Sequence, residues 1–272
     1  MDDAAVGVFD SGVGGLTVVR RIATRLPAEP VIYLGDTARV PYGTKSADTV
    51  IRYARACATL LCKRNVKLLV VACNTASAYA LDTLREELPI PVLGVIEPGA
   101  QRAVQATRNR KVGVIGTVGT VRSGAYQAVV HALDPAIEVL AKPCPLFVPL
   151  AEEGWLEGPV PAQVAHAYLD ELLAAGIDTL VLGCTHYPLL RSVIAEAAGD
   201  AVTIVDSAEA TAAVVADTLA AMGLACAPGG PPPRHRFLVT DDPAGFARIG
   251  ARFLDEGHPA RDLAEVEWVD FQ

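Results

Sequence analysis

Two cysteines stand in matching positions of this sequence. The run Val70–Thr75 (VVACNT) corresponds to Val181–His186 (VLGCTH), so Cys73 and Cys184 each end a short apolar stretch and precede polar residues. A thiolate is a base, and a thiol donates a proton. If the two cysteines face each other across a bound molecule, one removes a proton from a carbon atom and the other supplies one to the opposite face. Such a pair inverts a stereocentre, whereas a single base usually returns the proton to the face it came from.

The residues after each cysteine offer hydrogen-bond donors. We predict that each cysteine ends a strand and precedes a helix, whose N-terminus stabilises a thiolate. Asn74, Thr75 and Thr185 fit capping or first-turn positions, where their N–H and O–H groups can bind carboxylates. A small anionic substrate therefore needs no lysine or arginine at this site.

The elements that must position these residues alternate along most of the chain. Short apolar, β-branched runs are followed by longer helical patterns, which predicts an α/β fold with mostly parallel sheets covered by helices. The predicted strands are Ala5–Phe9, Val31–Leu34, Lys67–Ala72, Val92–Ile96, Val112–Ile115, Ile137–Leu140, Thr179–Leu182 and Val202–Val205. The predicted helices are Leu16–Arg25, Ala47–Arg64, Ala78–Glu87, Val121–Leu133, Ala162–Ala174 and Leu189–Ala198. A further helix from about Ala208 and a strand at Arg236–Thr240 complete the set.

The predicted order of strands occurs twice along the chain, as an internal repeat. Val6–Val8 (VGV) recurs as Val112–Val114, and in both halves the third strand ends at one of the two cysteines. We predict two similar lobes related by a pseudo-twofold axis. The first lobe comprises residues 1–95 plus 206–272, and the second comprises residues 96–205.

The candidate site follows from this topology. In open parallel sheets, ligands bind beyond the carboxyl ends of the strands. Six segments lie at such ends, and facing lobes would bring them together with the two cysteines on opposite walls. They are Asp10-Ser11, Asp36–Gly43, Cys73–Thr75, Gly116-Thr117, Glu152 (after a strand-like run at Leu146–Leu150) and Cys184–His186.

Four motifs resemble one known family. Val8–Gly15 (VFDSGVGG), Gly35–Gly43 (GDTARVPYG), Ala72–Ala76 (ACNTA) and Leu182–Pro188 (LGCTHYP) closely resemble the glutamate racemases, and the likeness runs from about Val6 to Val215. The resemblance implies interconversion of L- and D-glutamate by proton transfer between two cysteines, without pyridoxal phosphate or a metal. It also implies D-glutamate supply for peptidoglycan, and a homodimer.

The resemblance also assigns roles to residues. Cys73 is expected to act on D-glutamate and Cys184 on L-glutamate, while Asp10, Glu152 and His186 assist the two thiols, Asp10 near the first and His186 near the second. The residues expected to bind the substrate are Asp10, Ser11, Tyr42, Gly43, Asn74, Thr75, Thr117, Thr120, Thr185 and His186.

Composition narrows the class of protein. The formal charge of −8 disfavours general nucleic-acid binding, which relies on a basic surface. No apolar run approaches the length that crosses a bilayer, and we expect a cytoplasmic protein without a membrane anchor. Six cysteines without a Cys-x-x-Cys spacing are then expected to be free thiols. Cys57 and Cys62 are expected to pack in the core, and Cys144 and Cys226 are not expected to be catalytic.

Other interpretations stay open at this stage. The chain could be an aspartate or hydantoin racemase of the same architecture, or a two-lobed protein that binds an anion without turning it over. Gly12–Gly15 resembles part of a dinucleotide-binding motif, although Thr17 replaces its third glycine. Cys73, Cys184 and His186 could together hold zinc. Asp36 fits substrate contact as well as it fits support of the loop at Tyr42 and Gly43.

Overall fold

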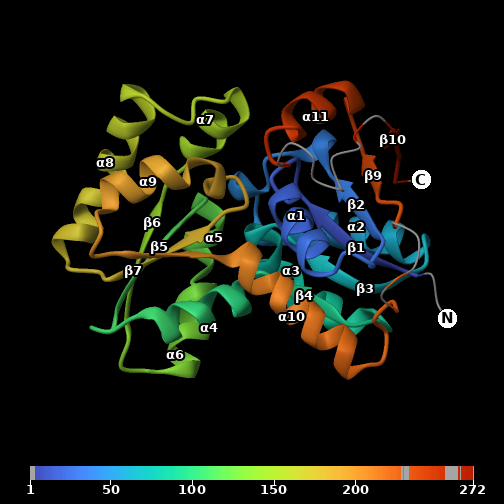
Figure 1. Cartoon of the computed structure of the whole chain (residues 1–272), viewed down its shortest axis with the longest axis horizontal. Coiled ribbons are helices and arrows are strands. Elements are labelled where there is room, and N and C mark those ends of the chain that lie inside the picture. Colours follow the sequence, from blue (N-terminus) through green and yellow to red (C-terminus); the bar gives the residue numbers. More distant parts are fainter. Residues whose placement is uncertain (1–3, 228, 230–232, 255–262, 264, 272) are drawn as a thin grey trace.

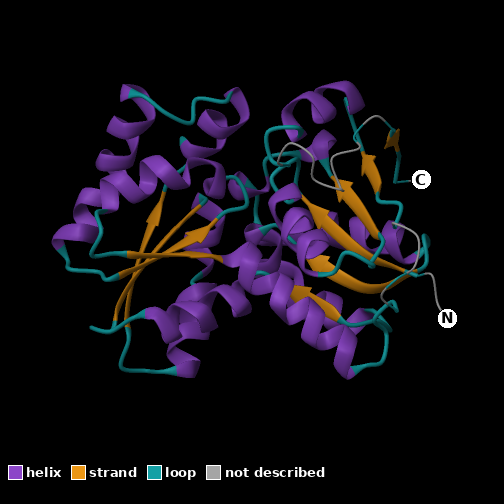
Figure 2. Ribbon diagram, in the orientation of Figure 1, coloured by secondary structure: helices purple, strands orange, loops and turns teal. Residues whose placement is uncertain are grey.

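The computed structural model describes residues 4–227, 229, 233–254, 263 and 265–271. Two sheets of parallel strands lie side by side, each covered by helices, and together they form the two lobes seen in Figure 1. Figure 2 shows the alternation of strand and helix that the sequence predicted. The predicted fold class is therefore confirmed.

The first sheet carries both ends of the described chain. Its strand order is β10-β9-β2-β1-β3-β4, and every pair is parallel. The strands are β1 (Ala5–Asp10), β2 (Val31–Gly35), β3 (Val66–Val71), β4 (Val92–Gly94), β9 (Arg236–Val239) and β10 (Val266–Trp268). The helices of this part are α1 (Leu16–Arg25), α2 (Ala47–Cys62), α3 (Asn74–Glu87), α10 (Ser207–Ala221) and α11 (Pro243–Gly250), with the short 3-10 helices η1 (Thr37–Arg39) and η2 (Tyr42–Thr44).

The second sheet has the order β6-β5-β7-β8, again parallel throughout. Its strands are β5 (Lys111–Gly116), β6 (Glu138–Pro143), β7 (Thr179–Gly183) and β8 (Thr203–Asp206). The helices are α4 (Ile96–Ala106), α5 (Val118–Ser123), α6 (Ala125–Leu133), α7 (Phe147–Glu153), α8 (Pro159–Ala174) and α9 (Arg191–Ala198), with the 3-10 helix η3 (Tyr187–Leu190). This order repeats β2-β1-β3-β4 of the first sheet, so the internal repeat is a repeat of topology.

Each sheet is buried on both faces, which explains the near-continuous apolar runs of its strands. In β3, Leu68 and Val70 pack with α1 and α10 on one face, while Leu69 and Val71 pack with α2 and α3 on the other. Fully burying one such side chain contributes about 1.5–3 kcal/mol. This packing fixes the strand ends, and therefore the position of Cys73 just beyond β3.

Several predicted elements differ in their bounds. Gly124 adopts a left-handed conformation (φ 68°), which divides the predicted helix Val121–Leu133 into α5 and α6. The prediction of a strand-like run at Leu146–Leu150 is wrong, because these residues form the N-cap and first part of helix α7. The predicted strand Val92–Ile96 ends at Gly94, and Ile96 begins α4.

The division of the chain into residues 1–95 with 206–272, and 96–205, stays a prediction. The C-terminal strands β9 and β10 extend the first sheet next to β2. Among the described residues, no helix combines the length and apolar character needed to cross a bilayer.

Candidate active site

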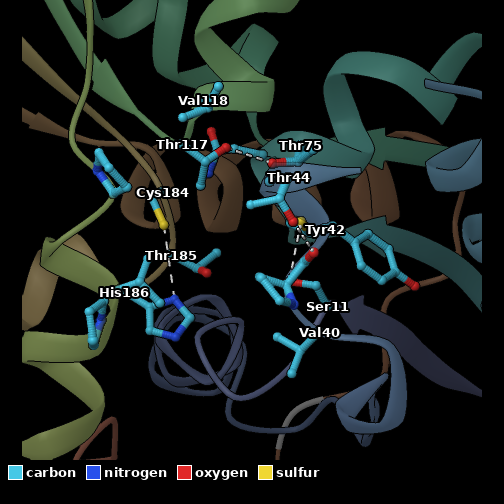
Figure 3. A pocket seen from close by; sticks show the side chains of 17 residues that line it. Ser11, Val40, Tyr42, Thr44, Thr75, Thr117, Val118, Cys184, Thr185 and His186 are labelled. Carbon is cyan, nitrogen blue, oxygen red and sulfur yellow. Dashed lines mark hydrogen bonds between the residues drawn. The ribbon is translucent and has the colours of Figure 1, made fainter. Parts of the chain in front are cut away.

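A cavity of about 190 Å³ lies beyond the carboxyl ends of both sheets. In Figure 3, Cys184 and His186 lie on one side of it and Ser11 and Tyr42 on the other. Both lobes contribute to its lining, which consists of Ser11, Val40, Pro41, Tyr42, Gly43, Thr44, Cys73, Asn74, Thr75, Thr117, Val118, Pro145, Val148, Pro149, Cys184, Thr185 and His186. The structure thus brings both cysteines to one cavity.

Cys73 precedes helix α3, as the sequence predicted, and occupies its N-cap position. Its sulfur donates to Ser11 Oγ at 3.6 Å, and the nearby Asp10 carboxylate interacts electrostatically with it. Burial, and after it the charge of Asp10, raise the pKa of the Cys73 thiol to about 12. The backbone hydrogen bond at the helix N-terminus lowers this pKa by less than Asp10 raises it. Cys73 is therefore a protonated thiol at neutral pH in the substrate-free protein.

Asp10 lies behind the cavity wall and does not line it. Its side chain is fully buried at the end of β1, and Gly12 donates a backbone hydrogen bond to Oδ2 at 3.1 Å. Burial raises the pKa of this carboxyl, while the charge of His186 lowers it by a smaller amount. Thr185 Oγ1 donates to Asp10 Oδ1 at 3.5 Å, so Asp10 also touches the opposite lobe.

The second cysteine has different neighbours. Cys184 Sγ lies 3.9 Å from His186 Nδ1, and His186 Nε2 lies 2.9 Å from Glu152 Oε1. Burial lowers the pKa of His186, but the hydrogen bonds with Cys184 and Glu152 outweigh it and raise that pKa to about 10. An imidazolium beside Cys184 stabilises negative charge on its sulfur. Three side chains thus form a relay from Glu152 to Cys184.

Two expectations about this side of the site need correction. Glu152 does not follow a strand: it lies in α7, and the helix brings it to His186. Cys184 is not followed directly by an α-helix, because residues 187–190 form η3 and α9 begins only at Arg191. At Cys184, the His186 side chain therefore takes the place of a helix N-terminus as the source of positive charge.

Two glycines allow the lobes to approach closely. A Cβ atom at Gly14 would lie 2.3 Å from Thr185 Oγ1 and 2.4 Å from His186 Nδ1. A Cβ atom at Gly43 would lie 2.7 Å from Thr117 Cβ. Close approach of lobes therefore explains Gly14 without a bound dinucleotide. Thr17 supports this, because its hydroxyl donates to Gly14 O and to Thr185 O, at 2.9 and 3.2 Å.

Uncharged donors gather where α3 and α5 meet. Thr75 Oγ1 lies 2.9 Å from Thr117 Oγ1 and 3.1 Å from Thr120 Oγ1. Asn74 and Thr75 form the first turn of α3, and both line the cavity, whereas Thr120 reaches it only through these contacts. Among the described residues that line the cavity, none is a lysine or an arginine. The arrangement suits a carboxylate held by hydrogen bonds.

The loop that carries Tyr42 is fixed from outside the cavity. The Tyr42 hydroxyl donates to Asp36 Oδ2, which also accepts from Arg39 Nε at 2.7 Å. Asp36 Oδ1 accepts from Thr240 Oγ1 at 3.0 Å, and Asp36 is fully buried. Asp36 therefore supports the loop and does not line the cavity. Arg39 lies in the predicted segment Asp36–Gly43, but Thr240 was not expected, because nothing in the sequence places residue 240 beside residue 36.

None of the six cysteines forms a disulfide, so all are free thiols. Within the part of the chain that the structure describes, no group of three or more His, Cys, Asp or Glu side chains is arranged to hold a metal ion. The apolar lining at Val148 and Pro149 and the polar Thr44 were not predicted, whereas Val40 lies in the predicted segment Asp36–Gly43. Thr44 directly follows the GDTARVPYG motif, so extending that motif by one residue would have found it.

The fold and the site together define a two-lobed α/β enzyme with a thiol on each side of one cavity. The sequence matches the family model described as Asp/Glu/Hydantoin racemase over residues 6–215. The chain belongs to this racemase family, and is thus an isomerase.

Relatives of known name refine this assignment. The chain is 57% identical over 250 residues to a glutamate racemase of Geobacter metallireducens, an alignment that covers 92% of both chains. The solved glutamate racemase isoform RacE1 of Bacillus anthracis is 40% identical and superposes with a TM-score of 0.91, covering 98% of this chain and 97% of its own. A Francisella tularensis glutamate racemase, solved with D-glutamate, is 37% identical with a TM-score of 0.89, and the match covers 100% and 99% of the two chains.

Proposed function

We propose that this chain interconverts L- and D-glutamate, with Cys184 and Cys73 as the two bases. The observation that carries the proposal is the presence of both thiols in one cavity, each in a different electrostatic setting. The names of its relatives support glutamate as the substrate.

The reaction from L- to D-glutamate begins at Cys184. The thiolate takes the α-proton, and the electron pair of the C–H bond moves toward the α-carboxylate. Cys73 then donates its thiol proton to the opposite face of the α-carbon. The products are D-glutamate, a Cys184 thiol and a Cys73 thiolate. The reverse reaction uses the same groups in opposite roles, and solvent exchange resets the two protons.

The two thiols have unlike neighbours in the substrate-free protein. His186 is protonated at neutral pH because its pKa is about 10, and its positive charge lies beside Cys184. Cys73 carries a proton because its pKa is about 12. D-glutamate requires the opposite arrangement, with a thiolate at Cys73 and a thiol at Cys184, so a net proton must first pass from Cys73 to Cys184. Because the two isomers are equally stable, kcat/KM must nevertheless be equal in the two directions.

The cavity stabilises the anionic intermediate without cationic side chains. Backbone N–H groups at the start of α3 and the hydroxyls of Thr75, Thr117 and Thr185 are donors near the cavity. Preorganised donors of this kind stabilise charge as it develops on a carboxylate. We propose that Asp10 and His186 assist the two thiols, and that Glu152 acts through His186. Ser11, Tyr42, Gly43 and Asn74 would bind substrate, while Thr120 would act through Thr75 and Thr117.

The wider role follows from the same proposal. D-glutamate made by this enzyme would supply peptidoglycan synthesis in the cytoplasm, and the enzyme would act as a homodimer. No pyridoxal phosphate is required, because the α-carboxylate itself accepts the electron pair. The resemblance of the four motifs to the glutamate racemases supports these points.

The test is incubation of the purified protein with L-glutamate in D₂O, without added cofactor. Loss of optical rotation, together with deuterium at the α-carbon of the D-product, is the expected result. Folded protein that leaves both signals unchanged would contradict the proposal. L- and D-aspartate, tested in parallel, distinguish an aspartate racemase. Binding of glutamate without deuterium exchange would identify a binding protein.

A further inference from the structure

One side-chain amide at the cavity lacks a partner. Asn74 is buried, at 3% exposure, and lines the cavity. Its Nδ2 is shielded from solvent and has no hydrogen-bond partner among the described residues. Leaving a buried donor unpaired is destabilising. A ligand carboxylate that supplied the missing acceptor would remove this destabilisation.

The other end of the same amide is held by the second lobe. Tyr126, in α6, donates its hydroxyl proton to Asn74 Oδ1 at 2.8 Å, and both residues are buried. The contact therefore crosses from the second lobe to the first residue of α3. It fixes which end of the amide accepts and which end is left to donate.

The surroundings keep Tyr126 a donor. Burial raises the pKa of its hydroxyl, against a smaller lowering by a hydrogen bond with Ser207, so the proton stays on oxygen. Gly99 leaves room for this hydroxyl, because a Cβ atom there would lie 3.3 Å from it. The phenol is thus enclosed, and Asn74 is the cavity residue it contacts through a hydrogen bond.

We propose that Tyr126 is a positioning residue that orients the Asn74 amide, so that Nδ2 donates to a carboxylate of the substrate. This inference rests on the proposed function, since it assumes that a carboxylate occupies the cavity. It also links substrate binding to the closed arrangement of the lobes, because separation of α6 from α3 would release the amide. Tyr126 itself does not line the cavity.

A double-mutant cycle tests the inference. KM for L-glutamate is measured for the wild type, Tyr126→Phe, Asn74→Ala and the double variant. Loss of the hydrogen bond that orients the Asn74 amide predicts that Tyr126→Phe raises KM about threefold to tenfold. In the Asn74→Ala background, the same change should alter KM less than about twofold, because the group it orients is gone. An equal increase in both backgrounds would overturn the inference.

Tyr79→Phe is the matched control. Tyr79 also lies in α3, and its hydroxyl donates across the lobes to Gly119 O at 2.9 Å, whereas the hydroxyl that donates to Asn74 is that of Tyr126. We expect its KM to stay within about twofold of the wild type. An increase as large as that of Tyr126→Phe would mean that KM reports lobe contacts in general, and would overturn the inference.

A spectroscopic measurement separates this inference from the proposed function. In ¹⁵N-labelled, substrate-free protein, the Asn74 side-chain N–H signals are assigned by their loss in Asn74→Ala. Tyr126→Phe should shift these signals and Tyr79→Phe should not. Unshifted signals would overturn the inference even in an active enzyme. Absence of racemisation in the wild type would instead overturn the proposed function, and the shift would still decide whether Tyr126 orients the amide.

Discussion

The two sides of the cavity share a backbone plan but not a charge distribution. Cys73 and Cys184 each follow the third strand of a four-strand repeat, and each exposes 6% of its surface. Cys73 lies beside Asp10, a buried carboxyl that disfavours a thiolate. Cys184 lies beside His186, which Glu152 helps to keep protonated. The repeat thus positions two equivalent sulfurs, but their neighbours differ: a carboxyl lies beside Cys73 and a protonated imidazole lies beside Cys184.

This difference matters for a reaction between mirror-image substrates. Racemisation requires one thiolate and one thiol. Two thiols with identical surroundings would have the same pKa, so neither would be favoured as the thiolate. A cation on one side and a carboxyl on the other make the surroundings of the two thiols unlike, and the carboxyl favours the thiol form of Cys73. A scaffold with nearly symmetric lobes can therefore deprotonate each isomer with a thiol that has its own set of neighbours.

Removal of either sulfur should have the largest effect. Cys73→Ala and Cys184→Ala each delete one proton-transfer group, and we expect kcat/KM to fall on the order of 10³–10⁴-fold in both directions. Polarimetry with each isomer measures this. Cys62→Ala, in α2, is the control and should retain activity. Near-normal activity of Cys184→Ala would contradict the proposal that both thiols transfer protons.

Loss of the imidazolium should come next. His186→Asn removes the positive charge beside Cys184, and kcat/KM should fall on the order of 10²-fold. Proton transfer at Cys184 then becomes the slower step. The isotope effect should therefore rise for L-glutamate deuterated at the α-carbon and shrink for the D-isomer. Equal isotope effects for the two isomers would contradict the assignment of His186 to the Cys184 side.

The carboxylate behind His186 should have a smaller effect that depends on pH. Because the pKa of His186 is raised to about 10, its charge is present below that pH and lost above it. Wild-type kcat/KM should hold up to about pH 10 and then fall. Glu152→Gln removes a hydrogen bond that raises this pKa, so the fall should move to lower pH, with a loss of about tenfold near pH 9.

The neighbouring glutamate provides the control for this pH profile. Glu153 ends α7 and is exposed, so Glu153→Gln should leave the profile unchanged. An unchanged profile in Glu152→Gln would show that Glu152 does not set the charge of His186.

The smallest effect concerns the Cys73 side. The charge of Asp10 raises the pKa of Cys73, after the larger effect of burial. Asp10→Asn should therefore let Cys73 ionise more readily and speed its alkylation about threefold to tenfold at pH 9. Mass spectrometry of the labelled peptide measures the rate. Slower alkylation than in the wild type would contradict the stated influence of Asp10.

Much of the fold could be predicted because buried parallel strands have apolar, β-branched sequences. Strands β1, β2 and β3 lie within about a residue of their predicted ends, since both faces of each strand are covered. Helix α7 was misread because the apolar run Leu146–Leu150 is short enough for either a strand or a buried helix. Strand β10 was not predicted, since three residues give too little pattern.

The candidate site divides in the same way. Cys73 and Cys184 were found because the repeat places them at equivalent strand ends, which is a local property of the sequence. The link from Tyr42 through Asp36 to Thr240 and the bond between Tyr126 and Asn74 depend on side chains from distant segments. Sequence pattern does not encode which distant side chains meet. Those contacts required the three-dimensional structure.

The most direct test of the account compares the two thiols in one substrate-free protein. Iodoacetamide alkylation of Cys73 and Cys184 is followed separately by mass spectrometry between pH 6 and pH 11, a range about the raised pKa of His186. Each cysteine exposes 6% of its surface, so accessibility alone does not separate their rates. Cys184 should react faster than Cys73 at neutral pH, because Cys184 lies beside the protonated His186, whereas burial and Asp10 raise the pKa of the Cys73 thiol to about 12. Equal rates at neutral pH would contradict the claim that unlike neighbours give the two sulfurs different reactivity.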